Sequence, residues 1–234
     1  MFKKLLQFNA ILLAVIVTAS CNNNKKTVME NATTSSTQKP VRVKSENVDY
    51  MGDGVTMKGF VAFNENDSAL KPVVLIVPEW WGISDYTRGR AKQLASLGYL
   101  AFAVDIYGEG KTAETPDEAG KLAKPFYAPG SPAQSRFDAA LTKIKTYPGA
   151  DTNKIAAIGY CFGGALVLNM ARLGEPLRGV VSFHGNLAGV PLKKELLKAD
   201  VLVCHGDSDK FVLPAEVATF KKQMDSIGAS YTFK

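Results

Sequence analysis

The chain has 234 residues, a length that fits one ordinary domain or one domain with a tail. Its composition, 46% hydrophobic and 21% charged, excludes a fibrous or fully disordered protein. The formal net charge is +6, but no Lys/Arg block carries interleaved aromatic residues, which argues against a nucleic-acid partner.

The three cysteines, Cys21, Cys161 and Cys204, are odd in number and widely spaced. This spacing excludes a disulfide framework, and the absence of a Cys-x-x-Cys pair argues against a zinc site. We therefore expect no metal, and we interpret each cysteine separately. Cys204 lies inside an apolar run and is expected in the core.

Residues 1–20 have the pattern of a secretory signal peptide. A short basic start at Lys3 and Lys4 precedes an apolar stretch over 10–17, and small residues follow over 18–20. The apolar stretch is too short to span a membrane. We expect this segment to be removed on export.

Cys21 resembles the acylated cysteine of bacterial lipoproteins, although Thr18 replaces the usual leucine. We expect lipidation at Cys21, with plain secretion or an uncleaved anchor as alternatives. Asn22 follows the cysteine, which by the sorting rule of such lipoproteins favours the outer membrane. We therefore expect an exported protein held by a lipid anchor, facing the periplasm or the cell surface, and otherwise a periplasmic one.

Residues 22–40 contain almost no large apolar side chains, so they cannot bury enough surface to offset the entropy lost on ordering. We interpret residues 21–40 as the lipidated cysteine and a flexible tether. The folded domain is expected over residues 41–234.

Hydrophobic patterns predict the elements of this domain in chain order. Residues 41–50 and 55–63 alternate as two strands joined by a turn. Residues 72–77 form a continuous apolar run stopped by Pro78, which is typical of a buried parallel strand. Further strands are predicted at 99–108, 154–160, 177–185, 200–206 and 230–234, and helices at 85–97, 116–127, 132–146, 162–173 and 214–228.

The alternation of strands and helices predicts an α/β fold with a mostly parallel sheet and helices on both faces. In such a sheet, ligands bind outside the carboxyl ends of the strands. Reactive side chains follow four of the predicted strands, namely Glu79, Asp105 with Tyr107, Cys161, and Asp209. We expect a site at this edge of the sheet.

Cys161 lies in Gly-Tyr-Cys-Phe-Gly, a glycine-x-nucleophile-x-glycine pattern between a predicted strand and helix. At so tight a turn, only glycine at positions 159 and 163 avoids clashes with the neighbouring elements. The helix N-terminus favours a thiolate, and the backbone N–H of Phe162 points to where an oxyanion would form. We interpret Cys161 as a nucleophile, the alternative being an inert buried cysteine.

Four segments over about residues 45–234 resemble the dienelactone hydrolase family of α/β-hydrolases, and they follow the order of that family. They are GYCFGGALVL, with cysteine in place of the more usual serine, PEWWGIS, VDIYG and HGDSDKFVLP. The resemblance implies an α/β-hydrolase fold, hydrolysis of a carboxylic ester or lactone, and no metal or organic cofactor. It is specific for the family and weakly specific for the substrate.

By this resemblance Cys161 is the nucleophile and Asp209 the acid of the triad, with Asp207 as a competing acid in the same loop. The backbone N–H groups of Phe162 and Trp80 are the oxyanion donors. Glu79 is expected beside the resting thiol, where a carboxylate disfavours a thiolate until substrate displaces it and protects the thiol from oxidation. The alternative for Glu79 is a solvated loop charge.

Three aromatic residues are candidates for substrate binding. We expect Trp80 and Trp81 to form the floor of the pocket and Tyr107 to form a hydrogen bond with the substrate. For each of them, an ordinary packing role is the alternative. Arg88 and Arg90 lie near the Glu79 loop in sequence and are candidate partners for a substrate carboxylate.

A thiol nucleophile needs a base, and the family order is Cys, Asp, His. The chain has two histidines, His184 and His205, and both precede Asp209. We expect His205 to be a hydrogen-bonding turn residue and His184 to be structural or at the pocket rim. The resemblance implies that the catalytic histidine follows Lys234, so we expect residues 41–234 to be a C-terminally incomplete domain.

These inferences predict a hydrolase of small-molecule esters or lactones with a Cys-His-Asp triad, in contact with a membrane only through its lipid anchor. The alternative from another class is a non-catalytic ligand-binding lipoprotein on a hydrolase fold. A nearer alternative is a serine-type esterase or peptidase relative.

Overall fold

The computed structural model describes residues 40–128 and 130–234. The predicted signal peptide, the lipidated Cys21 and the tether up to residue 39 lie outside these residues. Within the described part, none of the helices combines the length and apolar character that crossing a membrane requires.

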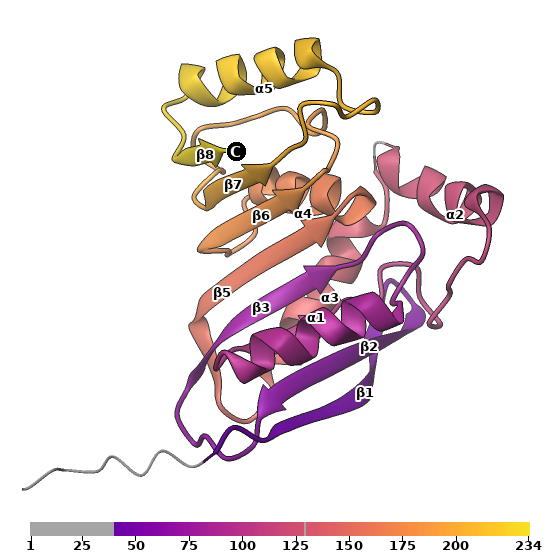
Figure 1. Ribbon diagram of the computed structural model, residues 1–234, viewed down its shortest axis with the longest axis vertical. Coiled ribbons are helices and arrows are strands. Elements are labelled where there is room, and N and C mark those ends of the chain that lie inside the picture. The colour runs from indigo at the N-terminus through magenta and orange to yellow at the C-terminus, as the bar shows by residue number, and fades with distance from the viewer. Residues whose placement is uncertain (1–39, 129) are drawn as a thin grey trace, which may run out of the picture. The chain divides into compact units, whose positions relative to one another are not determined.

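An eight-stranded sheet in the order β1-β2-β4-β3-β5-β6-β7-β8 organises the domain (Figure 1). The two pairs that include β2 are antiparallel, and the pairs from β4 through β8 are parallel. This confirms the predicted mostly parallel α/β sheet. The strands are β1 Val43–Gly52, β2 Val55–Asn64, β3 Lys71–Val77, β4 Leu100–Ala103, β5 Ala150–Tyr160, β6 Gly179–Phe183, β7 Asp200–Cys204 and β8 Tyr231–Phe233.

Five α-helices and one 3₁₀ helix connect the strands of the described domain, close to the predicted positions. The predicted helix over 116–127 is divided, because Pro125 follows Lys124 and cannot donate the next helical hydrogen bond. Thr115 and Glu118 form a capping box at its start. The helices are α1 Asp85–Ser96, α2 Pro116–Ala123, η1 Lys124–Tyr127, α3 Ala133–Lys145, α4 Phe162–Leu173 and α5 Pro214–Ser226.

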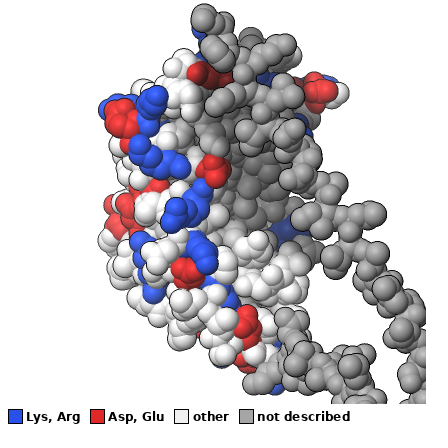
Figure 2. Space-filling model, turned by 90° about the vertical axis from the view of Figure 1, so that its left-hand side faces the viewer, with Lys and Arg blue, Asp and Glu red and all other residues white. Residues whose placement is uncertain are grey.

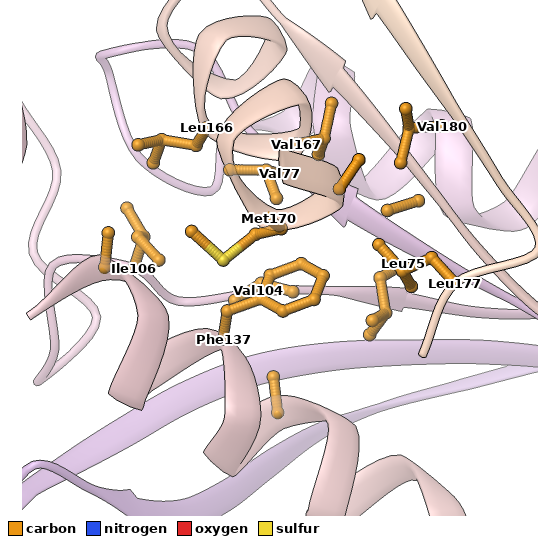
Figure 3. Packing of buried hydrophobic residues seen from close by; sticks show 14 of the residues in the cluster. Leu75, Val77, Val104, Ile106, Phe137, Leu166, Val167, Met170, Leu177 and Val180 are labelled. Carbon is orange, nitrogen blue, oxygen red and sulfur yellow. The ribbon is translucent and has the colours of Figure 1, made fainter. Parts of the chain in front are cut away.

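The helices cover both faces of the sheet, as predicted. In Figure 1, α1 lies on the near face and α3 and α4 on the far face. Ala91 and Ala95 bring α1 close to the near face because alanine adds little side-chain bulk. The far face carries the larger core, where Figure 3 shows Phe137 of α3 and Met170 of α4 in one cluster with Leu75 of β3. This shared core holds α3 and α4 against the far face of the sheet.

Asp105 is a buried carboxylate that organises the loop after β4 rather than facing the site. It accepts hydrogen bonds from the backbone N–H groups of Lys58, Gly108 and Gly110, at 2.8, 2.9 and 2.8 Å. Arg136 donates to the carbonyl oxygens of Ile106 and Tyr107 in the same loop. The expectation that Asp105 belongs to the reactive edge is therefore wrong, since its oxygens are used by backbone donors.

Charged side chains of both signs share the surface. On the face drawn in Figure 2, Lys and Arg lie among Asp and Glu. This mixture is typical of an ordinary solvated surface.

Candidate active site

The turn at Cys161 has a strained backbone conformation. Cys161 has φ 51° and ψ −116°, between the end of β5 and the start of α4. A non-glycine residue rarely adopts a positive φ, and such strain is typical of functional turns. The strand-turn-helix context predicted for an exposed nucleophile is thus present.

Two glycines make this turn possible, as the sequence predicts. A Cβ at position 159 would lie 2.0 Å from the carbonyl oxygen of Gly163, and a Cβ at position 163 would lie 2.2 Å from that of Val77. Both clashes are with backbone, which has no room to move. The glycines therefore allow α4 to approach β3 and β5 closely enough to place the helix N-terminus beneath the thiol.

Cys161 opens into a cavity of about 450 Å³ at the carboxyl ends of the strands. The residues predicted to share a site at the Cys161 turn and the Glu79 loop all line this cavity, namely Glu79, Trp80, Trp81, Cys161 and Phe162. Five further residues complete the lining. The lining residues are Glu79, Trp80, Trp81, Tyr127, Cys161, Phe162, His184, Asn186, Phe211 and Val212.

Burial raises the pKa of the Cys161 thiol, and the carboxylates of Glu79 and Asp209 add to this increase. The Phe162 backbone N–H acts in the opposite direction because it stabilises the thiolate. Together these effects favour the thiol form of Cys161.

Asp209 is fixed by hydrogen bonds in the loop after β7. Its Oδ1 accepts from the backbone N–H groups of Phe211 and Val212, at 2.8 and 3.2 Å. Although burial opposes ionisation, these bonds and the contact with His184 hold the pKa of Asp209 below its usual range. The Asp209 side chain is only 4% exposed, whereas Asp207 is exposed. This difference favours Asp209 over Asp207 as the acid.

His184 is the histidine that contacts this acid. Its Nδ1 lies 2.5 Å from Oδ2 of Asp209, and its ring is 47% exposed and lines the Cys161 cavity. The backbone brings it there, because Cys161 donates its N–H to the carbonyl of Phe183, the preceding residue. His184 also has a positive φ of 55°. The sequence leaves a structural role and a position at the pocket rim open for His184, and it does not predict the contact with Asp209, which lies in a loop 25 residues later.

His205 lies behind the acid. Its side chain is 8% exposed, its Nδ1 is 3.9 Å from Oδ2 of Asp209, and its backbone N–H donates to the carbonyl of Lys234. Its ring packs against Phe233. This position fits the expected turn histidine better than a base, since the ring is not among the residues that line the cavity.

Tyr107 differs from its predicted role. It is buried, and its hydroxyl donates to the carbonyl oxygen of Trp80 at 2.9 Å. Its ring stacks on Phe162 at 5.7 Å. Tyr107 therefore positions the two residues whose N–H groups are the predicted oxyanion donors, rather than binding substrate itself.

The loop from Glu79 to Gly82 forms one wall of the cavity. Gly82 donates its N–H to the carbonyl of Glu79, and the rings of Trp80 and Trp81 pack edge to face at 5.4 Å. Trp81 accepts a backbone hydrogen bond from Ala113, which ties this loop to the segment before α2. Both tryptophans line the cavity, as predicted.

Arg88 and Arg90 do not line the cavity. Arg88 donates to Asn47 and stacks over Phe60, and Arg90 donates to Gln93 on its own helix. Neither is placed to hold a substrate carboxylate at Cys161. In the described residues, no group of three or more His, Cys, Asp or Glu side chains is arranged to hold a metal ion.

Residues 44–234 match the model of the dienelactone hydrolase family. The chain belongs to this family. It is 28% identical over 196 residues to a putative carboxymethylenebutenolidase of Aquifex aeolicus, a match that covers 80% of this chain and 81% of that protein. It is likewise 27% identical to protein usf of Aquifex pyrophilus, over 80% of this chain and 81% of that protein.

Solved structures agree. A dienelactone hydrolase-like promiscuous phosphotriesterase from metagenomic libraries has a TM-score of 0.76 and 30% identity, over 82% of this chain and 80% of that one. An acylaminoacyl peptidase with 14% identity and a TM-score of 0.66 shares the fold, over 82% of this chain and 36% of that one. The α/β-hydrolase fold and the ester- or lactone-hydrolase family are therefore established for this chain.

Proposed function

We propose that this domain hydrolyses a carboxylic ester or lactone through a covalent thioester on Cys161. The observation that carries the proposal is the thiol itself, held on a strained turn at a helix N-terminus and opening into the cavity that Glu79 and His184 also line. A thiol suits esters better than amides, because an amine is a poor leaving group.

The reaction follows from these positions. The Cys161 sulfur loses its proton to a base and bonds to the carbonyl carbon, while backbone N–H groups of Phe162 and Trp80 stabilise the oxyanion. The carbon–oxygen bond to the alcohol then breaks, and the base returns its proton to the leaving alkoxide. Water attacks the thioester with the same base, which releases the acid and restores the thiol.

The base in this proposal is a histidine oriented by Asp209. The family resemblance predicts it after Lys234. Within the described residues, the contact between His184 and Asp209 favours His184 as a second candidate. His184→Asn in the full-length protein separates the two, because loss of the base lowers kcat by about 10³-fold or more, whereas loss of a rim residue has a far smaller effect.

Hydrolysis of 4-nitrophenyl acetate tests the proposed nucleophile. Cys161→Ala is expected to abolish turnover, and Cys204→Ala, a matched removal of a thiol from β7, to retain it. Iodoacetamide should inactivate the protein by alkylating Cys161, whereas serine-directed reagents should not. Full activity of Cys161→Ala would overturn the proposal, and so would the absence of hydrolysis across a panel of esters and lactones.

We also propose, from the sequence alone, that Cys21 is lipidated and that the protein is exported to the outer membrane. Incorporation of radiolabelled palmitate into the expressed protein, and its loss in Cys21→Ala, would test this. A labelled Cys21→Ala protein, or a wild-type protein without label, would contradict it.

A further inference from the structure

A second cavity of about 440 Å³ lies beside the one that contains Cys161. It runs between α4, the start of α3 and the loop before Leu192. Leu166, Met170 and Leu173 of α4 line it from one side, and Gln134 of α3 and Val190 of the loop from the others. The mechanism above uses none of these residues.

Tyr127 is shared by the two cavities. It ends η1, is 57% exposed, and packs edge to face on Phe162 with ring centroids 5.5 Å apart. Phe162 carries one of the proposed oxyanion donors. Tyr127 therefore borders both the cavity at Cys161 and the second cavity.

Helix α4 connects the same two places. It starts directly after the nucleophile, and Phe162, Leu166 and Leu173 recur at helical spacing along one side of it, with Met170 beside them. Phe162 lines the first cavity, and Leu166, Met170 and Leu173 line the second, so this side of α4 borders both cavities with apolar side chains.

The chemistry of the second cavity selects the kind of chain. None of the described residues that line it is charged. Its two amide side chains already have partners, since Asn169 accepts from the backbone N–H of Val190 at 3.0 Å and Gln134 donates to Glu175 at 2.8 Å. An anionic group would find no cation in this lining, whereas an alkyl chain would bury apolar surface against leucine, methionine and valine.

We propose that this second cavity is a subsite for an unbranched alkyl chain of the ester, with Tyr127 at its entrance. This inference rests on the proposed function, because the chain is placed by the ester carbonyl at Cys161. The alkyl chain belongs to either the acyl or the alcohol part of the substrate, and the two give separate arms of the test.

The test compares chain-length profiles of kcat/KM in the full-length protein. The acyl arm uses 4-nitrophenyl esters from acetate to octanoate, and the alcohol arm uses methyl to octyl acetates followed by acid release. Val190→Trp fills the cavity and is expected to lower the preference for the octyl chain over the shortest one by about tenfold in one arm. Tyr127→Ala, which widens the entrance, should raise the same preference.

Leu97→Trp is the matched control, since Leu97 follows α1, is 73% exposed and lines neither cavity. It should leave both profiles as in the wild type. Profiles that Val190→Trp and Tyr127→Ala leave unchanged in both arms would overturn the subsite.

A second measurement separates failure of the subsite from failure of the proposed function. Alkylation of Cys161 by N-octyl iodoacetamide, relative to iodoacetamide, is followed by peptide mass spectrometry and requires no turnover. If no ester is hydrolysed but the octyl reagent reacts faster and loses this advantage in Val190→Trp, the subsite stands without the hydrolase. Equal chain-length ratios in wild type and Val190→Trp would refute the subsite, whatever the hydrolytic activity.

Discussion

The turn that carries Cys161 and the loop that carries Asp209 lie at the same edge of the sheet but are held by different means. The turn depends on the absence of side chains at Gly159 and Gly163. A Cβ at these positions would lie 2.0 and 2.2 Å, respectively, from a backbone carbonyl oxygen. The loop depends on hydrogen bonds to one buried carboxylate, and its neighbour Phe211 is 83% exposed. Cys161 is thus positioned by packing and Asp209 by polar contacts, so the two positions should respond differently to substitution.

Asp209→Asn is expected to have the largest effect on activity. An asparagine keeps the size of the side chain but cannot hold a histidine in the required tautomer and charge state, so kcat should fall by about 10⁴-fold. Asp207→Asn, two residues away and exposed, is the control and should stay close to wild type in the same ester assay. A larger loss in Asp207→Asn than in Asp209→Asn would reverse the assignment of the acid, and equal losses would contradict it.

Gly163→Ala should cost the most stability. Alanine is favoured over glycine inside a helix by about 1 kcal/mol, but here its Cβ would lie 2.2 Å from the Val77 carbonyl oxygen. The clash is expected to prevail, with a net loss of about 3 kcal/mol in the free energy of unfolding measured by urea denaturation. Gly206→Ala in the acid loop, where a Cβ meets nothing within 4 Å, should change this free energy by about 0.5 kcal/mol or less.

Glu79→Gln is expected to make the thiol more reactive. Burial is the main cause of the raised pKa of Cys161 and the Glu79 carboxylate adds to it, so neutralising Glu79 should increase the thiolate fraction and with it the rate of iodoacetamide alkylation at pH 7. The exposed Glu114→Gln provides the control. An unchanged rate in Glu79→Gln would show that the carboxylate does not restrain the thiol.

The stabilities of Asp209→Asn and Gly163→Ala should also differ in their dependence on pH. Because the pKa of Asp209 is lowered in the fold, its charged form adds stability that is present above the usual aspartate pKa and lost as pH falls through the folded-state value. The stability deficit of Asp209→Asn should therefore shrink as pH falls below about 4. The deficit of Gly163→Ala is steric and should stay constant, and parallel pH profiles for both variants would contradict this account.

Phe211→Ala should have the smallest effect. Asp209 uses the backbone N–H of Phe211, and the exposed ring contributes little to the core, so the free energy of unfolding should change by about 0.5 kcal/mol or less. Thermal unfolding measures this change. A loss of several kcal/mol would mean that the ring, and not the backbone, holds the acid loop.

The parts of the site that the sequence predicts are those set within one strand-turn-helix unit. The turn at Cys161 and the loop that begins at Glu79 belong to this class, because each directly follows a strand and precedes a helix, a pattern that is local in the sequence. The roles of His184 and Tyr127 depend on which strands and loops become neighbours, and no local pattern records that. Tyr107 shows the same limit, since a tyrosine after a strand has one sequence pattern whether its hydroxyl reaches substrate or the Trp80 carbonyl.

The direction of β1 has a practical consequence. β1 is antiparallel to β2, which is antiparallel to β4, so β1 runs in the same direction as the parallel strands. The polypeptide therefore enters the domain at the amino ends of these strands (Figure 1). Cys161 directly follows β5 and so lies at their carboxyl ends. A domain coupled to a bead or an electrode through the residues before Val43 would present its pocket outward, with the path of incoming substrate left clear of the support.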